Sequence, residues 1–327
     1  ITGWGDDGGS GTGGNALAVT AQGMVNDLNM SNNVITNGDS TVNSTAILYK
    51  HYGQQRTAGL QIDNNLITRA GSEAISVLLG SSANAGNQPD RSVSVCGNTI
   101  SNCSLSATSP VVHITTDPTN LTPGIISSYQ VSNNTISFCG PDDSPCDYIR
   151  VDLVQYDRAH GGVIADNVIS GGIWGTLNTD SRPLRGIAAD IPSTGDDVGG
   201  RALAVTGNSI EGTGNASIAG ILVNLEGDVY GLSVDSNSVT GHTLLGSDLH
   251  GHIVVRINDK DLIGGSISNN VLTTLAAEQA ESGIWVEQLN ATASRVVRDV
   301  AIDGNRIDGV DGEYGIRASL SNCVGRA

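Results

Sequence analysis

The stretch LSVDSNSVTG, residues 232–241, decides the fold of this chain and raises a question about Asn237. Leu232, Val234 and Val239 alternate with polar residues as they would in a β-strand, yet Ser236 and Asn237 stand in the middle of the run. Asn and Ser are poor strand residues and favour bends. The stretch is therefore expected to form two short strands on either side of a sharp bend.

The same pattern recurs along the chain. An Asn with an apolar residue three places before it and two places after it occurs nine times, 29 to 41 residues apart. The nine are Asn33, Asn65, Asn98, Asn134, Asn167, Asn208, Asn237, Asn270 and Asn305. Self-similarity at such a period indicates a solenoid whose loops vary in length.

The residue before each of these Asn residues predicts how the bend forms. It is Asn, Asp, Gly or Ser in every case, and most of these residue types tolerate a positive φ. A left-handed residue there would turn the chain sharply and allow the following Asn to point inward. Stacked Asn residues would then pair their side-chain amides, which offsets the cost of burying them.

A second kind of strand follows each bend after a variable loop. GILVNL at 220–225 and GIWVEQ at 283–288 are examples, and ten such segments occur. Their alternation of apolar and other residues predicts strands. Each repeat then holds three short strands whose apolar positions share one interior, as in a parallel β-helix.

The combination of these strands and Asn bends resembles the right-handed parallel β-helix repeat of the pectate-lyase-like superfamily, which includes tailspike-like and secreted polysaccharide-active proteins. The resemblance covers roughly residues 16–320. It implies an all-β solenoid of about ten rungs with three short strands per rung. We expect a Gly-rich lead-in at residues 1–15 and a single β-helix domain at 16–327, part of a longer protein or assembly.

Charge and composition exclude some partners. The chain has 33 acidic against 16 basic residues, a formal net charge of −17, and aromatic residues make up only 3%. Such acidity disfavours binding to nucleic acid or to an anionic membrane surface. No apolar run reaches membrane-spanning length, so we expect no membrane insertion.

The resemblance implies a substrate groove along the first sheet, the one built from the GILVNL-like strands. Alternate residues of a strand face outward. One outward column then reads Asp152, Asp190, Asn224, Arg256 and Glu287, and the neighbouring column includes His113, Arg150 and Trp285. Strands stack about 4.8 Å apart, so the column from Asp152 to Glu287 would span roughly 19 Å, the length of a few sugar units.

Three interpretations of this column stay open. Asp152 and Asp190 on neighbouring strands would crowd two carboxylates and raise one pKa, as glycoside hydrolysis requires. Alternatively, Asp152, Asp190 and Asn224 would bind Ca²⁺ while Arg256 abstracts a proton next to a uronate carboxylate, as the lyase relatives imply. The third interpretation is a solvated face on which Arg150 and Arg256 neutralise the carboxylates.

Two residues outside the column are further candidates. The longest spacing, 41 residues, brackets Asp190, and long loops on a regular scaffold often carry function. Trp174 and Tyr156 lie in this neighbourhood and are expected to offer stacking faces to sugars.

Two His-containing motifs rank lower. Asp248, His250 and His252 in DLHGH have strand spacing and metal-ligand chemistry, but no fourth ligand is apparent, and we expect an ordinary pair of surface His residues instead. The sequence Lys50-His51-Tyr52 is interpreted as loop surface.

Five cysteines leave the disulfide pattern open: Cys96, Cys103, Cys139, Cys146 and Cys323. Cys103 and Cys139 each lie five residues after a repeat Asn, so they should stack at a distance compatible with a disulfide. CGPDDSPC can instead join Cys139 to Cys146, and the odd count leaves at least one thiol.

The sequence therefore predicts an extracellular, cell-surface or virion-surface protein that binds a polysaccharide along its first sheet, with cleavage as an added expectation and Ca²⁺ as the one cofactor considered. The alternative is a non-catalytic structural or adhesive solenoid, such as a fibre or shaft subunit. Terminal strands need capping, so a homotrimer or head-to-tail self-association is also expected.

Overall fold

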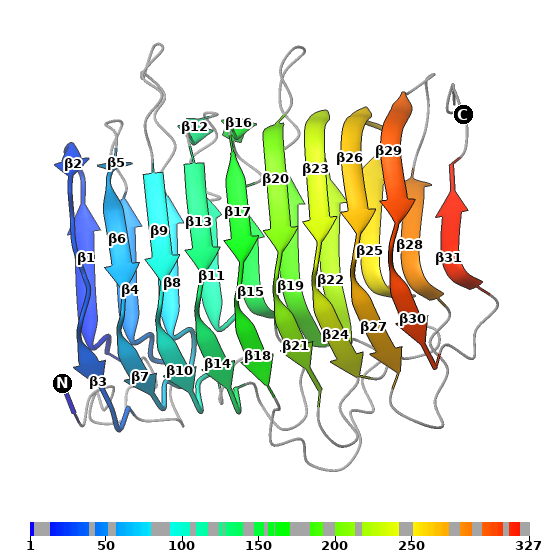
Figure 1. Ribbon diagram of the computed structural model, residues 1–327. Coiled ribbons are helices and arrows are strands. Elements are labelled where there is room, and N and C mark those ends of the chain that lie inside the picture. The colour runs from blue at the N-terminus through cyan, green and yellow to red at the C-terminus, as the bar shows by residue number, and fades with distance from the viewer. Residues whose placement is uncertain are drawn as a thin grey trace.

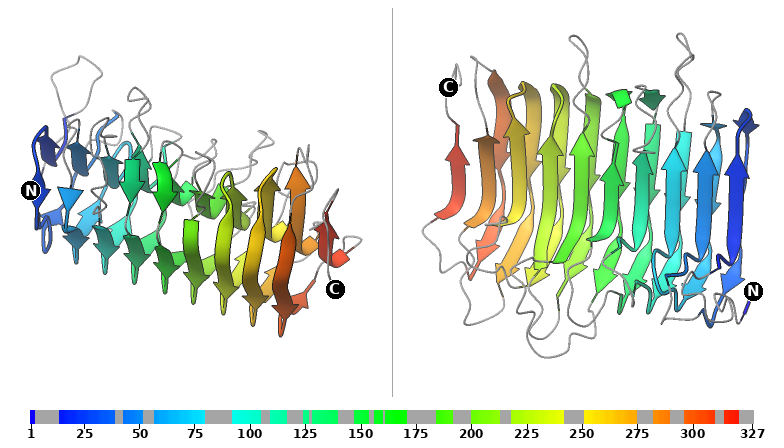
Figure 2. Two further views of the ribbon diagram at one scale, coloured as in Figure 1. Left: turned by 90° about the horizontal axis from the view of Figure 1, so that it is seen from above. Right: turned by 180° about the vertical axis from the view of Figure 1, so that it is seen from behind.

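A computed structural model describes residues 1–2, 14–38, 43–51, 57–79, 92–104, 109–116, 124–126, 128–139, 147–153, 156–159, 161–170, 184–191, 200–212, 218–241, 251–274, 282–289, 296–309 and 314–320. This part of the chain is all-β and forms a parallel β-solenoid (Figure 1). Successive turns lie side by side from the N-terminal to the C-terminal end (Figure 2). No helix in the described residues is long and apolar enough to cross a membrane.

Three long parallel sheets wind together. The ten-stranded sheet contains, in order, β1 (Leu17–Ala21), β4 (Ile47–His51), β8 (Ile75–Leu79), β11 (Val112–Thr116), β15 (Asp147–Asp152), β19 (Leu184–Ile191), β22 (Ile218–Leu225), β25 (Gly251–Asn258), β28 (Ser282–Leu289) and β31 (Tyr314–Ser319). The eight-stranded sheet contains β6 (Leu60–Asp63), β9 (Ser92–Cys96), β13 (Ser128–Ser132), β17 (Gly162–Ala165), β20 (Gly200–Thr206), β23 (Val229–Asp235), β26 (Leu262–Ser268) and β29 (Val297–Asp303). The nine-stranded sheet contains β3 (Val34–Ile35), β7 (Leu66–Thr68), β10 (Thr99–Ser101), β14 (Thr135–Ser137), β18 (Val168–Ser170), β21 (Ser209–Glu211), β24 (Ser238–Gly241), β27 (Val271–Thr274) and β30 (Arg306–Asp308).

The expectation of ten rungs with three strands each is met only in part, because in the part of the chain that the structure describes some turns lack a strand in one of the three sheets. The first turn meets the eight-stranded sheet only through an isolated bridge between Asn29 and Gln61. After β31 the described residues contain no further strand. Two small sheets add strands that the repeat did not predict, namely β2 (Val25–Asn26) with β5 (Thr57–Ala58), and β12 (Gly124–Ile126) with β16 (Tyr156–Ala159).

The core is a continuous column of aliphatic side chains inside the three sheets. In β4, Ile47, Tyr49 and His51 are buried while Leu48 and Lys50 are less so, which is the alternation expected of a strand with one buried face. His51 is therefore not on a loop surface as the sequence analysis expected, and its Nε2 lies 2.9 Å from the Gly23 carbonyl oxygen. Tyr52 lies outside the described residues.

The bends confirm the prediction made from LSVDSNSVTG. Each of the nine residues before a repeat Asn has a positive φ, between 56° and 67°. They are Asn32, Asn64, Gly97, Asn133, Asp166, Gly207, Ser236, Asn269 and Gly304. The chain thus turns between the eight-stranded and nine-stranded sheets at the same place in every turn.

The nine repeat Asn residues form a continuous side-chain ladder, which we call the Asn ladder. Within it, Asn167 Oδ1 accepts hydrogen bonds from Asn134 N at 3.1 Å and Asn134 Nδ2 at 2.9 Å. Asn167 Nδ2 donates to Asn208 Oδ1 and to the Val131 carbonyl, each at 2.9 Å. The pattern runs from Asn33 to Asn305, so the buried amides find partners on the neighbouring turns.

A second set of left-handed residues was not predicted. Six residues of the type Asp, Gly or Ala, each six places before a ladder Asn, also have positive φ: Asp27, Gly59, Ala202, Gly231, Gly264 and Asp299. In β20 and β23 the strand pairing omits Ala202 and Gly231, so the eight-stranded sheet is bent there. The residue types share too little for the sequence to reveal this position.

The cysteines follow the predicted stacking but are not joined. Cys103 and Cys139 are buried, and the Cys103 N–H donates to Cys139 Sγ at 3.4 Å. No disulfide joins Cys103 to Cys139, and Cys96 is not disulfide-bonded either. Cys146 and Cys323 lie outside the described residues.

Candidate functional site

The strand register places the predicted polar column as expected. Across the ten-stranded sheet, Asp152 is opposite Asp190, which is opposite Asn224, which is opposite Arg256, which is opposite Glu287. These five residues are called the outer stripe below. Since each step joins adjacent strands, the stripe crosses the sheet without interruption.

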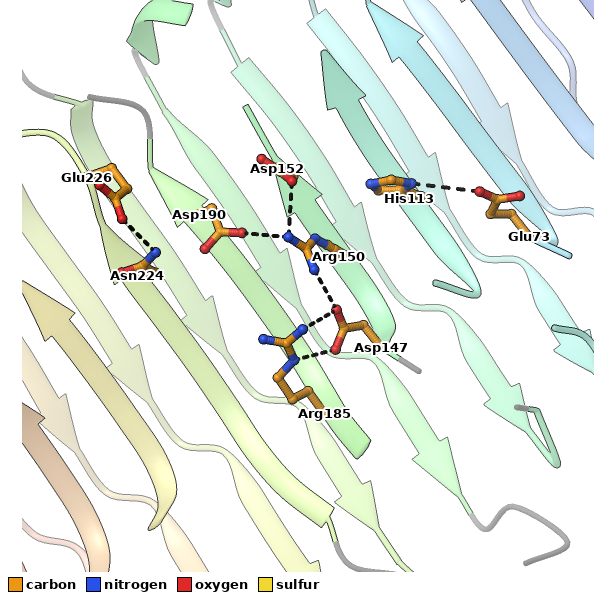
Figure 3. A network of polar contacts seen from close by, with 9 residues as sticks. All are labelled: Glu73, His113, Asp147, Arg150, Asp152, Arg185, Asp190, Asn224 and Glu226. Carbon is orange, nitrogen blue, oxygen red and sulfur yellow. Dashed lines mark hydrogen bonds and ion pairs between the residues drawn. The ribbon is translucent and has the colours of Figure 1, made fainter. Parts of the chain in front are cut away.

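Arg150 connects the carboxylates at one end of the outer stripe (Figure 3). Its Nη2 lies 3.1 Å from Asp152 Oδ2 and 3.3 Å from Asp190 Oδ2, and its Nη1 lies 3.3 Å from Asp147 Oδ2. Arg185 holds the same Asp147 through both of its oxygens, at 2.5 and 2.9 Å. The result is a network of three carboxylates and two guanidinium groups, and the sequence analysis had not included Asp147 or Arg185.

The surroundings of Asp190 shift the pKa of its carboxyl group. Burial raises the pKa of Asp190, the charge of Asp152 raises it further, and Arg150, the Asn224 amide and Arg185 act in the opposite direction. The net effect is a pKa above the ordinary value. A raised pKa on one carboxyl of a pair is what the hydrolysis interpretation requires.

The position of Arg150 weighs against cleavage by this pair. One nitrogen atom, Nη2, contacts both Asp152 and Asp190, so their Oδ2 atoms are no farther apart than the sum of the two contacts. That limit falls just short of the roughly 6.5 Å at which inverting glycosidases begin, but the roughly 5–5.5 Å of retaining glycosidases lies within it, so the argument against cleavage rests on the guanidinium itself. A glycosidic bond would have to displace the guanidinium to enter between the carboxylates, whereas a sugar lying across them would not.

The side chain of Asn224 is also engaged with the protein. Its Nδ2 donates to Glu226 Oε1 at 3.0 Å, and its amide lies close enough to Asp190 to oppose the rise of that carboxyl's pKa. Glu226 in turn accepts from Asn258 Nδ2 at 2.9 Å. The stripe thus continues as a chain of amides and carboxylates.

These contacts do not fit the expected calcium ligands. The Asn224 amide turns its N–H groups toward carboxylates, and a guanidinium already supplies the positive charge between Asp152 and Asp190. In the described residues no group of three or more His, Cys, Asp or Glu is placed to hold a metal ion. Binding of Ca²⁺ by Asp152, Asp190 and Asn224 therefore stays a prediction.

Arg256 and Glu287 form an ion pair at the other end of the outer stripe. Their side chains are 20% and 10% exposed, so both are largely shielded from solvent. Arg256 would have to leave Glu287 before it could abstract a proton from a substrate. The ion pair therefore favours a structural role for Arg256 over a role as a catalytic base.

An apolar column runs beside the outer stripe. Leu222, Val254 and Trp285 form a buried cluster of their own, separate from the main core. The Arg317 guanidinium lies 4.6 Å from the centre of the Trp285 ring. Trp285 is only 7% exposed, so its use as a stacking face would require Arg317 to move.

His113 is oriented by a carboxylate that the sequence analysis missed. Glu73 Oε2 accepts hydrogen bonds from Thr45 Oγ1 at 3.1 Å and from Ser72 Oγ at 2.5 Å, while Glu73 Oε1 lies 3.9 Å from His113 Nδ1. Burial would raise the pKa of Glu73, but the nearby His113 and the hydrogen bond from Ser72 outweigh it and lower the pKa from 4.5 to about 2. Glu73 lies two residues before β8, and this position was the only signal for it in the sequence.

The remaining predicted site residues are not brought to the outer stripe by any described contact. Tyr156 begins β16, which pairs with β12 in a small separate sheet. His252 is fully buried in β25, so the expectation of a surface His is wrong for this residue. Trp174, Asp248 and His250 lie outside the described residues.

Comparison with known proteins assigns no family to this chain. No family model matches the chain, and neither curated proteins nor solved structures give a match. The parallel β-solenoid is thus established by strand pairing alone. Kinship with the pectate-lyase-like superfamily stays a prediction.

Proposed function

We propose that this protein binds an extended polysaccharide along the outer stripe of its ten-stranded sheet. The observation that carries the proposal is the register, which aligns five consecutive polar side chains from Asp152 to Glu287 on adjacent strands. Adjacent strands repeat at about 4.8 Å, so the stripe offers a hydrogen-bonding group at each step along roughly 19 Å. A polymer with regularly spaced hydroxyl groups matches such a surface.

The chemistry of the stripe favours binding over cleavage. Asp152, Asp190 and Glu287 are held by arginines, and Asn224 is held by Glu226. Groups fixed in this way are pre-organised to orient a ligand, which lowers the entropic cost of binding. The proposal also places the protein outside the cell, at a cell or virion surface, where polysaccharides are exposed.

The test is a glycan array probed with the wild-type chain and with Asp152→Asn/Asp190→Asn. Both substitutions keep the side-chain shape and remove charge. We expect the wild type to bind a subset of glycans and the double variant to bind them at least about tenfold more weakly, because each carboxylate becomes an amide that is part donor and Arg150 loses two of its three carboxylate partners. Reducing-end release and double-bond absorbance are measured on every bound glycan to detect cleavage.

The matched control is Glu211→Gln/Asp308→Asn, which removes two charges from β21 and β30 of the nine-stranded sheet. This control should bind like the wild type. If the Asp152/Asp190 variant folds and binds every recognised glycan unchanged, the outer stripe is not the binding surface. If the wild type binds no glycan, the structural or adhesive solenoid becomes the better explanation.

A further inference from the structure

We propose that the polysaccharide recognised by the outer stripe is uncharged, and specifically that it is not a polyuronate. The inference rests on the proposed function and specifies its substrate class. It follows from how the charged groups on the outer face of the ten-stranded sheet are already paired.

Three arginines within and beside the outer stripe are paired with protein carboxylates, whereas Arg317 on β31 packs on the Trp285 ring. Arg150 contacts Asp147, Asp152 and Asp190, and Arg185 contacts Asp147 through both oxygens. Arg256 contacts Glu287. A uronate carboxylate is recognised best by a guanidinium that offers two parallel N–H donors, and each of these guanidiniums would first have to release a partner.

Negative charge exceeds positive charge along the same surface. Asp147, Asp152, Asp190, Glu226 and Glu287 supply five carboxylates, whereas Arg150, Arg185, Arg256 and Arg317 supply four guanidiniums. A uronate placed across these residues would bring one more carboxylate beside groups that are only partly exposed. Like charges at such distances oppose binding, and the formal net charge of −17 adds a repulsive field at long range.

Neutral sugars can hydrogen-bond to these carboxylates without charge repulsion. An ionised carboxylate has about four acceptor positions, so Asp152 and Asp190 keep acceptor capacity beyond their contacts with Arg150. Sugar hydroxyl groups are donors of the right kind for these oxygens, and hydrogen bonds to an ionised acceptor are among the stronger ones.

The decisive comparison uses polymers that differ only in charge. Polyuronates with several linkages, among them polygalacturonate and alginate, are each paired with the carboxyl-reduced polymer, which has the same linkages but no carboxylate. Binding of the full chain is measured at low ionic strength and again after the ionic strength is raised about tenfold, which shortens the screening length about threefold.

We expect at least one carboxyl-reduced polymer to bind about tenfold or more tightly than its parent, and the preference to shrink when salt screens the repulsion. In Asp152→Asn/Asp190→Asn the preference should also fall, even though overall affinity is lower. The control Glu211→Gln/Asp308→Asn should keep the full preference. A merely structural role of the two Asp residues would lower both affinities equally and leave the preference intact.

The outcomes separate the two proposals. A polyuronate that binds as tightly as its reduced partner, or more tightly, overturns the uncharged-glycan inference and leaves polysaccharide binding in place. If no polymer and no glycan on the array binds, the proposed function itself is wrong and the inference falls with it.

Discussion

Asn167 shows most clearly how a buried polar side chain joins neighbouring turns of this solenoid. Its side chain makes hydrogen bonds to both neighbouring turns, because its oxygen accepts from Asn134 and its nitrogen donates to Asn208 and to the Val131 carbonyl. Burying an amide without partners costs free energy, whereas a fully bonded one fixes the register of three turns at once. The Asn ladder thus fixes the register between turns as well as stabilising them.

Removal of this amide should be costly. Asn167→Ala leaves the backbone N–H and Nδ2 of Asn134 and the Val131 carbonyl without their partner, and each orphaned buried group costs about 1–3 kcal/mol. We expect the free energy of unfolding, measured with denaturant, to fall by about 3 kcal/mol or more. The control is Asn33→Ala, since Asn33 is the first ladder residue and no earlier ladder Asn donates to it; it should cost about 1 kcal/mol. Equal losses for the two variants would contradict this account of the ladder.

Glu73 should control part of the acid stability. Its pKa is about 2 in the folded protein against 4.5 for the ordinary group. A lowered pKa contributes stability that is present above 4.5 and is lost as the pH falls through about 2. The full shift corresponds to at most about 3 kcal/mol. Asp190 acts in the opposite sense, because its raised pKa contributes stability at low pH that is lost as the pH rises.

The measurement is the free energy of unfolding against pH for the wild type and Glu73→Gln. The difference between the two curves isolates Glu73 from Asp190 and should be largest above pH 4.5 and shrink toward pH 2. Glu211→Gln, an exposed position in β21, serves as the charge control and should leave the curve unchanged. Parallel curves for Glu73→Gln and the wild type would show that Glu73 gains nothing from Ser72 and His113.

At the scale of the strand, the unpredicted bends in the eight-stranded sheet offer a matched pair of substitutions. Ala202 in β20 and Gly231 in β23 occupy equivalent places on adjacent turns, with φ of 54° and 86°. A Cβ at Gly231 would approach nothing closer than the Ala202 Cα at 4.0 Å, so backbone strain alone separates Gly from Ala. Ala202→Gly should stabilise the protein and Gly231→Ala should destabilise it, each by about 0.5–1 kcal/mol. Thermal unfolding would contradict this if both changes had the same sign.

The strands also show what the sequence could and could not predict. The place of Asp190 beside Asp152 was predictable because the Asn bends fix the register, and register decides which outward residues are neighbours. The ion pairs of Asp147 with Arg185 and of Glu73 with His113 were not, because they depend on side-chain direction at strand ends. The burial of Trp285 was missed for the same reason, since alternation gives the face of a residue but not what covers it.

At the scale of the whole molecule, each turn contacts only its neighbours in the three sheets. Stability in such a solenoid is approximately a sum of turn and interface contributions. A complete turn should therefore be removable if the cut preserves register. Ser238 is opposite Val271, so deletion of residues 238–270 joins Asn237 to Val271 in the same phase of the repeat.

We expect this deletion variant to fold as a solenoid with one turn fewer, with Asn224 next to Glu287 and an outer stripe shorter by about 4.8 Å. Far-UV circular dichroism should keep its β signature, the unfolding free energy should fall by the contribution of one turn, and affinity for long glycans should drop because Arg256 and one contact step are lost. Deletion of residues 238–254 removes about half a turn and would place Arg256 two residues after Asn237, where Val239 is buried in the core, so this variant should not fold. If both deletions behave alike, register between turns is not what determines this fold.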